Sequence, residues 1–347
     1  MAWHREIRRD YQFFSRIVNG KEQKFMAPLK VGVERYEIYD ILSVAGGFGI
    51  IYKARDLRLA GHEVLIKSRR YDGEPGLFSF QGDTSREGKI EKIRNKTEFE
   101  AECLKMFKQN RESRMPILND VVYGFSPTIY GPHEDMYGEE YYVKEDYIFD
   151  EPYIVMQVIN GINLGDYVSK GIKAVCSERG YKCYYEWEMA VLEYAKELTT
   201  IFAGFHTLHH DNKGDYFYIY QDLKPENIIL SHNRFLTLLD FGGITKIKIK
   251  NRTNRNGVLG TFGFQAPEAR NPALLRNLDQ RCDIYTLGAT LYQLLTGFDF
   301  ADILETADSE IPLEKSLKGV CSDATYAVLK KCLERDREKR YKNMIDV

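Results

Sequence analysis

The sequence has little that would mark it as a secreted, membrane-spanning or nucleic-acid-binding protein. Its six cysteines are scattered, with no C-x-x-C pair and no nearby histidine cluster, which favours reduced structural thiols over disulfides or a zinc site. No stretch reaches the roughly eighteen uninterrupted apolar residues of a membrane span, and the first residues lack the apolar core of a signal peptide. A formal net charge of −2 offers no basic excess for nucleic acid. These absences predict a cytoplasmic chain without a nucleic-acid or membrane partner.

Internal repeats and low-complexity linkers are also missing. At 347 residues the chain is long enough for two lobes and a sizeable core. Its apolar and aromatic content is that of a folded globular protein. The composition therefore predicts one catalytic domain with insertions.

One stretch, residues 220–230, concentrates residues suited to phosphate chemistry. Asp222, Lys224 and Asn227 follow the spacing D-x-K-x-x-N. A carboxylate can accept a hydroxyl proton, an ammonium can neutralise a phosphate, and an amide oxygen can bind a hard cation such as Mg²⁺. A short apolar strand follows, and a second one ends at Asp240. If the two strands form a hairpin, Asn227 and Asp240 can share one metal–nucleotide complex.

This stretch resembles the catalytic domain of a eukaryotic-like (Hanks-type) serine/threonine protein kinase of bacterial type, and the other motifs of that family occur along the chain in the expected order. The resemblance implies a bilobal α+β fold, with a small β-rich N-lobe carrying one key helix and a larger, mainly helical C-lobe. It implies ATP and Mg²⁺ as cofactors and a protein or peptide substrate with a Ser/Thr acceptor. The expected divisions are an N-terminal extension, an N-lobe with hinge and two insertions, and a C-lobe: residues 1–33, 34–160 (insertions at about 71–95 and 133–151) and 161–347.

Two predicted strands flank a glycine turn ahead of Lys67. Gly46, Gly47 and Gly49 let backbone amides approach phosphate oxygens, so they are predicted to cover the nucleotide phosphates. The kinase pattern G-x-G-x-x-G has its first glycine where this chain has Val44. By itself, the turn is equally typical of an ordinary hairpin. Its position before Lys67 favours the interpretation as a nucleotide-binding turn.

Lys67 emerges from an apolar strand at the distance where the family's lysine pairs with the α- and β-phosphates. A lone lysine at a strand end is otherwise simply solvated. Leu65 stands where the family usually has alanine, and would crowd the adenine. Glu100 and Glu102 compete as the helix partner of Lys67. Glu100 is preferred because Leu104 follows it on the same helix face.

The strand leading to the hinge is expected at residues 153–161. The resemblance places Met156 behind the adenine as a flexible apolar gatekeeper. Backbone groups hold the base there, so side-chain identity is permissive. The residues expected around the nucleotide, besides the glycines and Lys67, are Ile51, Met156, Gln157, Val158 and Ile229.

The two residues before the catalytic base depart from the family pattern. The family has His-Arg there, whereas this chain has Tyr220 and Gln221. A neutral glutamine cannot form a charged, bidentate clamp on a phosphate. We therefore predict a kinase that does not depend on phosphorylation through that arginine, in which phosphomimetic changes at Thr245 or Thr253 alter activity little.

Three later positions also match the family. Lys224 and Thr261 resemble the serine/threonine version of the fold, in which the threonine contacts the base and the lysine. Asp283 is interpreted as a helix N-cap, as the residue that holds the catalytic-loop backbone, or as both. Arg340 is placed to form a structural ion pair with Glu268.

Several segments keep more than one interpretation. Residues 1–33 are an extra helix or a leader, and the acidic, tyrosine-rich residues 134–151 are a solvated loop or a docking surface for a basic partner. The alternation from Lys246 to Lys250 predicts a strand whose basic face is solvated or selects acidic substrates. The chain stops within the expected last helix, so further domains beyond Val347 are expected.

Two other classes of function remain open at this point. A pseudokinase or nucleotide-binding scaffold would keep the fold without turnover, and the departures named above favour it. The kinase domain of a larger peptide-modifying or small-molecule-phosphorylating enzyme would use the same chemistry on another acceptor. Because every residue that needs charge for the reaction is present, a serine/threonine protein kinase is the preferred hypothesis, with Asp222, Lys224, Asn227, Lys67 and Glu100 as its catalytic residues.

Overall fold

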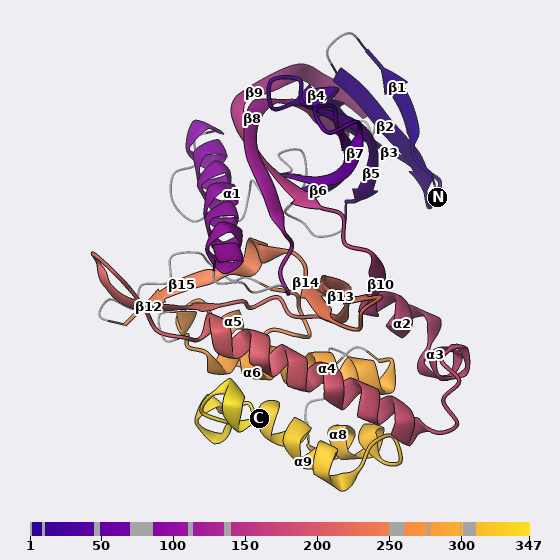
Figure 1. Cartoon of the computed structure of the whole chain (residues 1–347), viewed down its shortest axis with the longest axis vertical. Helices are drawn as coiled ribbons and strands as arrows, with labels where there is room; N and C mark the ends of the chain where they lie inside the picture. The colour runs from indigo at the N-terminus through magenta and orange to yellow at the C-terminus, as the bar shows by residue number, and fades with distance from the viewer. Residues whose placement is uncertain are drawn as a thin grey trace. The chain divides into compact units, whose positions relative to one another are not determined.

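The computed structural model describes residues 2–8, 11–44, 49–69, 86–109, 114–134, 140–249, 260–275, 278–298, 300 and 310–347, and for residues 126–149 only the backbone. The chain forms two compact units. Unit 1 comprises residues 1–111 and 116–158, and unit 2 comprises residues 112–115 and 159–347. Unit 1 is rich in strands and unit 2 is mainly helical (Figure 1), so the expected α+β fold class is confirmed.

Unit 1 is built on an antiparallel six-stranded sheet with the order β4-β5-β6-β7-β9-β8. Its strands are β4 (Lys30–Val31), β5 (Tyr36–Ser43), β6 (Gly49–Asp56), β7 (His62–Arg69), β8 (Leu118–Glu134) and β9 (Glu140–Gln157). Apolar residues alternate along β5 and β6, so one face of the sheet is buried. Ile38, Tyr52, Ile66 and Tyr153, each at most 3% exposed, lie in the resulting core. The two strands predicted on either side of the glycine turn are therefore present as β5 and β6, and residues 45–48 between them lie outside the described residues.

The first residues form a second sheet, order β1-β2-β3, rather than a helix. Its strands are β1 (His4–Ile7), β2 (Tyr11–Val18) and β3 (Lys21–Pro28). Phe14 and Phe25 are buried in the same core as the six-stranded sheet. Gln12 is fully buried, and its Nε2 donates to the carbonyls of Pro28 and Ile38, both at 2.9 Å. The aromatic residues of this segment thus join unit 1 through strands, and the helix interpretation is wrong.

A single long helix, α1 (Arg86–Gln109), packs on strands β7, β8 and β9 of unit 1 (Figure 1). The sequence placed an insertion up to about residue 95, but the helix begins at Arg86. Ile93 is buried one turn before Thr97, and Glu100 and Leu104 continue the same buried face. The apolar spacing therefore extends further toward the N-terminus than the charged residues around it suggested.

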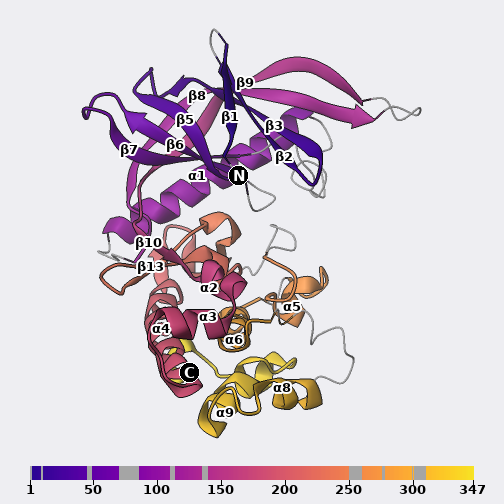
Figure 2. The same ribbon diagram turned by 90° about the vertical axis from the view of Figure 1, so that its right-hand side faces the viewer.

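Strands β8 and β9 continue beyond the sheet as a two-stranded ribbon (Figure 2). Pairing runs from Leu118 with Met156 to Glu134 with Glu140, with several register shifts. The segment 134–151 is consequently hairpin for most of its length, not a simple loop. The side chains of its acidic run lie largely outside the described residues, so the docking hypothesis stays a prediction.

Unit 2 is organised around two long helices. Its α-helices are α2 (Leu164–Lys170), α3 (Ile172–Glu178), α4 (Tyr184–Phe205), α5 (Pro267–Arg270), α6 (Arg281–Thr296), α8 (Glu310–Leu317) and α9 (Asp323–Cys332). The described part of unit 2 also contains the short 3₁₀ turns Pro225–Asn227, Phe241–Gly243, Arg337–Lys339 and Met344–Asp346.

Helices α4 and α6 pack together and carry most of the core of unit 2 (Figure 1). Apolar residues recur along α4 at three- and four-residue spacing, which is typical of a core helix, and the helix ends at Phe205. Trp187 is 1% exposed, and its indole donates to the Leu294 carbonyl at 2.8 Å. Helix α6 is buried on all sides from Cys282 to Leu295. Among the described residues, no helix is long and apolar enough to cross a membrane.

Two small antiparallel sheets of unit 2 hold the loops between its helices. One has the order β10 (Gly161–Asn163), β13 (Ile228–Ser231) and β14 (Leu236–Leu238), and the other β11 (His209–Asp211), β12 (Gly214–Ile219) and β15 (Thr245–Lys248). In β15, Thr245 and Ile247 are buried while the two lysines are half-buried, as the alternation predicted.

Candidate active site

The carboxylate of Asp222 takes part in a hydrogen-bonded group within unit 2. The Thr261 hydroxyl donates to Asp222 Oδ1 at 2.7 Å and accepts from Lys224 Nζ at 2.6 Å. Lys224 Nζ also lies 3.7 Å from Asp222 Oδ2. The threonine therefore contacts both the carboxylate and the lysine, which is the arrangement that the resemblance implied.

Asn227 ends a 3₁₀ turn directly after this loop. Its Nδ2 donates to the Asp222 carbonyl at 2.8 Å and to Asp222 Oδ2 at 3.1 Å. Because the NH₂ group is the donor in both bonds, the amide oxygen is the group of Asn227 that remains to accept a cation. The side-chain amide of Asn227 is thus oriented by Asp222, the residue predicted to be the catalytic base.

The predicted hairpin between Asn227 and Asp240 is present. Ile228 pairs with Leu238, and the Leu239 amide donates to the Asn227 carbonyl at 2.7 Å. Asp240 follows with a left-handed φ of 50°, and its Oδ1 accepts from the Gly242 amide at 2.9 Å. The hairpin therefore places the amide of Asn227 and the carboxylate of Asp240 beside its two strand ends.

Gly243 lets the chain after Asp240 lie against the catalytic loop. A Cβ at this position would be 2.8 Å from the Tyr220 carbonyl oxygen and 3.1 Å from Asp222 Cβ. Real Cβ atoms do not approach backbone oxygens so closely. Glycine is required here by the close approach of the two segments.

Burial raises the pKa of the Asp222 carboxyl above its ordinary value. The positive charge of Lys224 opposes this rise, the negative charge of Asp240 adds to it, and hydrogen bonds from Thr261 and Asn227 lower the pKa. Asp240 thus adds negative charge to the surroundings of Asp222. A divalent cation would relieve their repulsion.

Asp283 holds the backbone of the catalytic loop from helix α6. Its Oδ2 accepts from the Tyr220 amide and its Oδ1 from the Gln221 amide, both at 2.9 Å. Oδ2 also lies 2.9 Å from His206 Nε2. Gln221 has a left-handed φ of 66°, a conformation that costs free energy in a residue with a side chain. The fully buried carboxylate stabilises that backbone, and α6 has Gln280 rather than Asp283 as its N-cap.

Tyr220 fills the position of the family's histidine with a buried aromatic ring. It stacks on Phe205 with ring centroids 6.0 Å apart and meets Phe241 edge-on at 5.6 Å. Its hydroxyl donates to the carbonyl of Leu239, the residue before Asp240. The tyrosine therefore links the catalytic loop to the segment that carries the second carboxylate.

Gln221 fills the position of the family's arginine and is 2% exposed. Its Nε2 donates to Thr245 Oγ1 at 2.8 Å and to the Gly243 carbonyl at 3.3 Å. Thr245 is itself buried in β15. A carboxylate at Thr245 would be buried beside a glutamine, and the small effect on activity expected of a phosphomimetic change there stays a prediction. Thr253 lies outside the described residues.

In unit 1, Lys67 and Glu100 form the expected ion pair. Lys67 Nζ lies 2.5 Å from Glu100 Oε1, and both side chains are nearly inaccessible to solvent. Glu102 is exposed on the other side of α1, which settles the choice between the two glutamates. The pair is held between strand β7 and helix α1.

Of the predicted nucleotide flap, the structure describes Gly49 but not Gly46 or Gly47. Gly49 begins β6 opposite Arg69, and a Cβ there would be 2.8 Å from the Ser68 carbonyl oxygen. This glycine thus has a packing requirement of its own. Ile51 lies directly opposite Lys67 in the β6–β7 pairing.

The residues expected around the adenine lie in both units. Met156 is 8% exposed and pairs with Leu65 across β9 and β7. Gln157 is exposed, and Val158 is half-buried at the end of unit 1. Ile229 is half-buried in β13 of unit 2. Their roles toward a nucleotide stay predictions.

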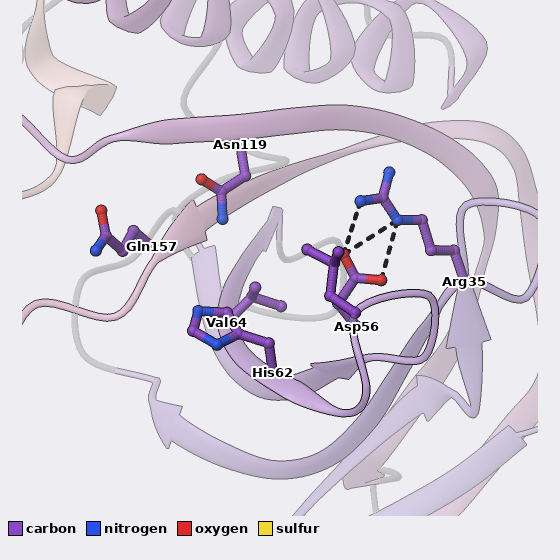
Figure 3. A pocket seen from close by; sticks show the side chains of 7 residues that line it. Arg35, Asp56, His62, Val64, Asn119 and Gln157 are labelled. Carbon is purple, nitrogen blue, oxygen red and sulfur yellow. Dashed lines mark hydrogen bonds and ion pairs between the residues drawn. The ribbon is translucent and has the colours of Figure 1, made fainter.

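A pocket of about 340 Å³ lies elsewhere in unit 1, lined by Arg35, Asp56, Leu59, His62, Val64, Asn119 and Gln157. Figure 3 shows the Arg35 guanidinium facing the Asp56 carboxylate, with Nη2 2.7 Å from Oδ2. The hydrogen bond from Arg35 holds the pKa of Asp56 below its ordinary value. Because these two charges satisfy each other, the pocket gives no reason to expect a charged ligand.

Arg340 and Glu268 form the predicted ion pair in unit 2. Arg340 Nη1 lies 2.6 Å from Glu268 Oε1, and Nη2 lies 2.9 Å from Oε2. The arginine is 3% exposed. This bidentate contact joins helix α5, which contains Glu268, to the end of the 3₁₀ turn Arg337–Lys339 and is structural.

A comparison with family models decides the identity of the fold. The protein kinase domain model matches residues 136–344, more than half of the chain. The chain belongs to the protein kinase domain family. Its match to a bacterial relative, "Serine/threonine-protein kinase PrkC" of Bacillus subtilis (strain 168), is 25% identical over 318 residues and covers 89% of this chain and 39% of the relative. The predicted resemblance to a bacterial-type kinase domain is confirmed.

Other relatives of this kinase domain agree. "Serine/threonine-protein kinase Sgk1" of Homo sapiens is 28% identical over 194 residues, which cover 55% of this chain and 39% of the relative. The chain thus spans 39% of the length of these curated relatives. Among solved structures, "PpkA-294 apo form" gives a TM-score of 0.56 at 19% identity and covers 90% of this chain and 94% of that one. "ROP18 kinase domain in complex with AMP-PNP and sucrose" also gives 0.56, at 17% identity, with 99% and 80% covered. These structures support the fold.

Within the kinase domain, the structure also contains functional contacts that the sequence did not predict. The hydrogen bond from Tyr220 to Leu239 and the one from Gln221 to Thr245 depend on strand pairings far apart in the chain. The only sequence signal was negative, in that neither residue matches the family. Arg69, discussed below, had no sequence signal beyond its place two residues after Lys67.

Proposed function

We propose that this chain is a serine/threonine protein kinase that transfers the γ-phosphate of ATP, with Mg²⁺, to a hydroxyl of a protein or peptide. The observation that carries the proposal is the hydrogen-bonded group of Asp222, Thr261 and Lys224. It combines a proton acceptor, a positive charge and the threonine typical of the serine/threonine version of the family. The names of the curated relatives support the same acceptor.

Asp222 is proposed to orient the acceptor hydroxyl and take its proton. The carboxylate is nearly buried yet retains a positive neighbour, so it is a base held in a site of low dielectric. Lys224 offsets charge on the phosphate during transfer. In unit 1, Lys67 is proposed to bind the α- and β-phosphates while Glu100 fixes its position.

Asn227 and Asp240 are proposed to hold Mg²⁺, which when bound would offset the negative charge of the ATP phosphates. The donor set fits a hard cation, since it consists of an amide oxygen and a carboxylate at the ends of one hairpin. Among the described residues there is no cluster of three or more metal-binding His, Cys, Asp or Glu side chains. Two protein oxygens completed by phosphate and water are what Mg²⁺ typically takes in a nucleotide site.

The proposed nucleotide pocket has two sets of residues. Those proposed to cover the phosphates are Gly46, Gly47, Gly49 and Ile51, and those proposed to surround the adenine are Met156, Gln157, Val158 and Ile229.

Activity is proposed not to depend on a phosphorylation switch that acts through an arginine before the catalytic base. The buried hydrogen bond between Gln221 and Thr245 supports this. The six free cysteines support a reducing, cytoplasmic location.

The test is a transfer assay with radiolabelled ATP and Mg²⁺ on generic protein substrates, followed by mass spectrometry of the modified residues. We expect phosphoserine or phosphothreonine from the native chain and none from Asp222→Asn. Binding of nucleotide without transfer by either protein would contradict the proposal and favour a scaffold. Transfer only to a sugar or another small molecule would contradict the protein acceptor.

A further inference from the structure

Helix α1 is bound to strand β7 by a second buried cation besides Lys67. Arg69 lies two residues after Lys67, so both side chains leave the same face of β7. Arg69 Nη2 lies 2.7 Å from Glu100 Oε2, while Lys67 holds Oε1 of the same carboxylate at 2.5 Å. The three side chains are between 3% and 6% exposed. Both oxygens of Glu100 are therefore bound by cations of one strand.

Arg69 also contacts α1 one turn earlier. Its Nε donates to Thr97 Oγ1 at 2.8 Å, and the Thr97 hydroxyl donates in turn to the Ile93 carbonyl at 3.1 Å. Thr97 is 1% exposed. Threonine has below-average helix propensity, so it does little for the stability of the helix itself. Its hydroxyl instead accepts the buried hydrogen bond from Arg69.

The geometry of the guanidinium explains what these two contacts do together. Thr97 and Glu100 are three residues apart and share one helix face. A planar guanidinium bonded to both fixes the rotation of the helix about its axis as well as its distance from the strand. An ammonium makes a point contact and leaves that rotation less restricted. Arg69 thus determines the direction in which Glu100 meets Lys67.

We propose that Arg69 is a positioning residue for phosphate transfer, which holds α1 in the rotation where Glu100 directs Lys67 toward the nucleotide phosphates. The inference rests on the proposed function, because it assigns that task to Lys67. Its physical basis is the low dielectric around the group, where loss of one hydrogen bond to a charged side chain leaves its partner poorly solvated. All the contacts that hold α1 in this rotation come from residues of unit 1.

Three single variants, one double variant and one matched control test this role. Arg69→Gln removes the charge and the fork, Arg69→Lys keeps the charge without the fork, and Thr97→Val removes one acceptor at nearly constant volume. Arg58→Gln is the matched control, because Arg58 is an exposed arginine in the turn after β6. For each protein one measures kcat, KM for ATP and for a peptide, affinity for a fluorescent ATP analogue, and hydrogen exchange across α1.

We expect Arg69→Gln to lower kcat by about ten-fold to about a hundred-fold, the range for a lost hydrogen bond to a charged group. KM for the peptide should stay constant, and exchange across α1 should become faster. Thr97→Val should act in the same direction with a smaller loss, and Arg69→Lys should recover part of the Arg69→Gln loss. The double variant Arg69→Gln, Thr97→Val should be no worse than Arg69→Gln, because both break the same contact. Arg58→Gln should match the native protein.

Native rates and native exchange in folded Arg69→Gln would overturn the proposal. It would also be overturned if Arg69→Gln lowered only the melting temperature, with kcat per folded molecule unchanged, since the contact would then be structural. If the native chain transferred no phosphate, the proposed function would fail, and exchange and nucleotide affinity would still decide the role of Arg69. In that case, faster hydrogen exchange across α1 and weaker nucleotide binding in the Arg69 and Thr97 variants, but not in Arg58→Gln, would support the role of Arg69.

Discussion

The Thr261 hydroxyl donates to Asp222 Oδ1 at 2.7 Å and accepts a hydrogen bond from Lys224 at 2.6 Å. This one side chain therefore orients both the proposed base and the proposed charge donor. The contact forms because the segment around Thr261 lies against the loop that carries Asp222 and Lys224, almost forty residues earlier in the chain.

Replacement of Thr261 by valine should lower kcat by about ten-fold, because one hydrogen bond to each of two charged groups is lost. Thr261→Ser keeps the hydroxyl and is the matched control. Steady-state kinetics on the two variants measures the difference. A serine variant as slow as the valine variant would contradict this account, because serine keeps the hydroxyl that makes both hydrogen bonds.

The pH dependence of transfer should report the raised pKa of Asp222. The base acts only when ionised, so kcat/KM should fall as the pH drops through a value above that of an ordinary aspartate. Lys224 and Thr261 both lower this pKa, so Lys224→Met and Thr261→Val should move the acidic limb to still higher pH. A limb that stays in place in both variants would mean that another group titrates.

Asp283 should be required for the fold of the catalytic loop. Asp283→Asn replaces one acceptor oxygen by a donor that faces a backbone amide or His206, in a fully buried position. We expect a loss of about 1.5–3 kcal/mol in the free energy of unfolding for each broken charged contact, together with lower kcat. Urea denaturation measures the first effect, and native stability in the variant would contradict the account.

Activity should not require phosphate on Thr253. Thr253→Ala and Thr253→Glu are both expected to leave kcat essentially unchanged, because Gln221 is neutral and its amide is already bound to Thr245. Loss of transfer in a folded Thr253→Ala protein would contradict this. Thr245→Val, in contrast, should cost about 1 kcal/mol of stability, since it removes a buried hydrogen bond.

Glu188 should stabilise unit 2 in a pH-dependent way. Burial raises the pKa of Glu188, but hydrogen bonds from Thr325 and from the hydroxyl and amide of Ser322 outweigh it, and the pKa is lowered overall. Its contribution is therefore complete above the pKa of an unfolded glutamate and is lost as the pH falls through the lower folded value. Glu188→Gln should cost about 1–3 kcal/mol near neutral pH, and less in acid. A difference that does not shrink in acid would exclude this charge as the cause.

Local sequence patterns predicted much of the fold because they act over short distances. The apolar spacing of α4 and α6 lies within single elements, and the hairpin between Asn227 and Asp240 joins two strands that are close in the sequence. The Lys67–Glu100 pair joins strand β7 to helix α1 across 33 residues, and its prediction came from the family resemblance and from the helix face that Glu100 shares with Leu104. The start of α1 was missed because charged residues surround Ile93, whose burial depends on tertiary packing.

The remaining features depend on partners far away in the chain. Residues 1–33 gave no clear period, and only pairing and the burial of Phe14 and Gln12 against the main sheet make strands of them. Arg69 resembles a solvated charge until Thr97 and Glu100 are brought opposite it. Long-range pairing, rather than residue type, gives these side chains their role.

The most direct test of the central claim is γ-phosphate transfer from ATP with Mg²⁺ by the native chain and by Asp222→Asn, with the modified residues located by mass spectrometry. The account predicts phosphoserine or phosphothreonine in the native reaction and its loss in the variant, with nucleotide binding retained in both. Equal transfer by the two proteins, or nucleotide binding without transfer by either, would contradict it.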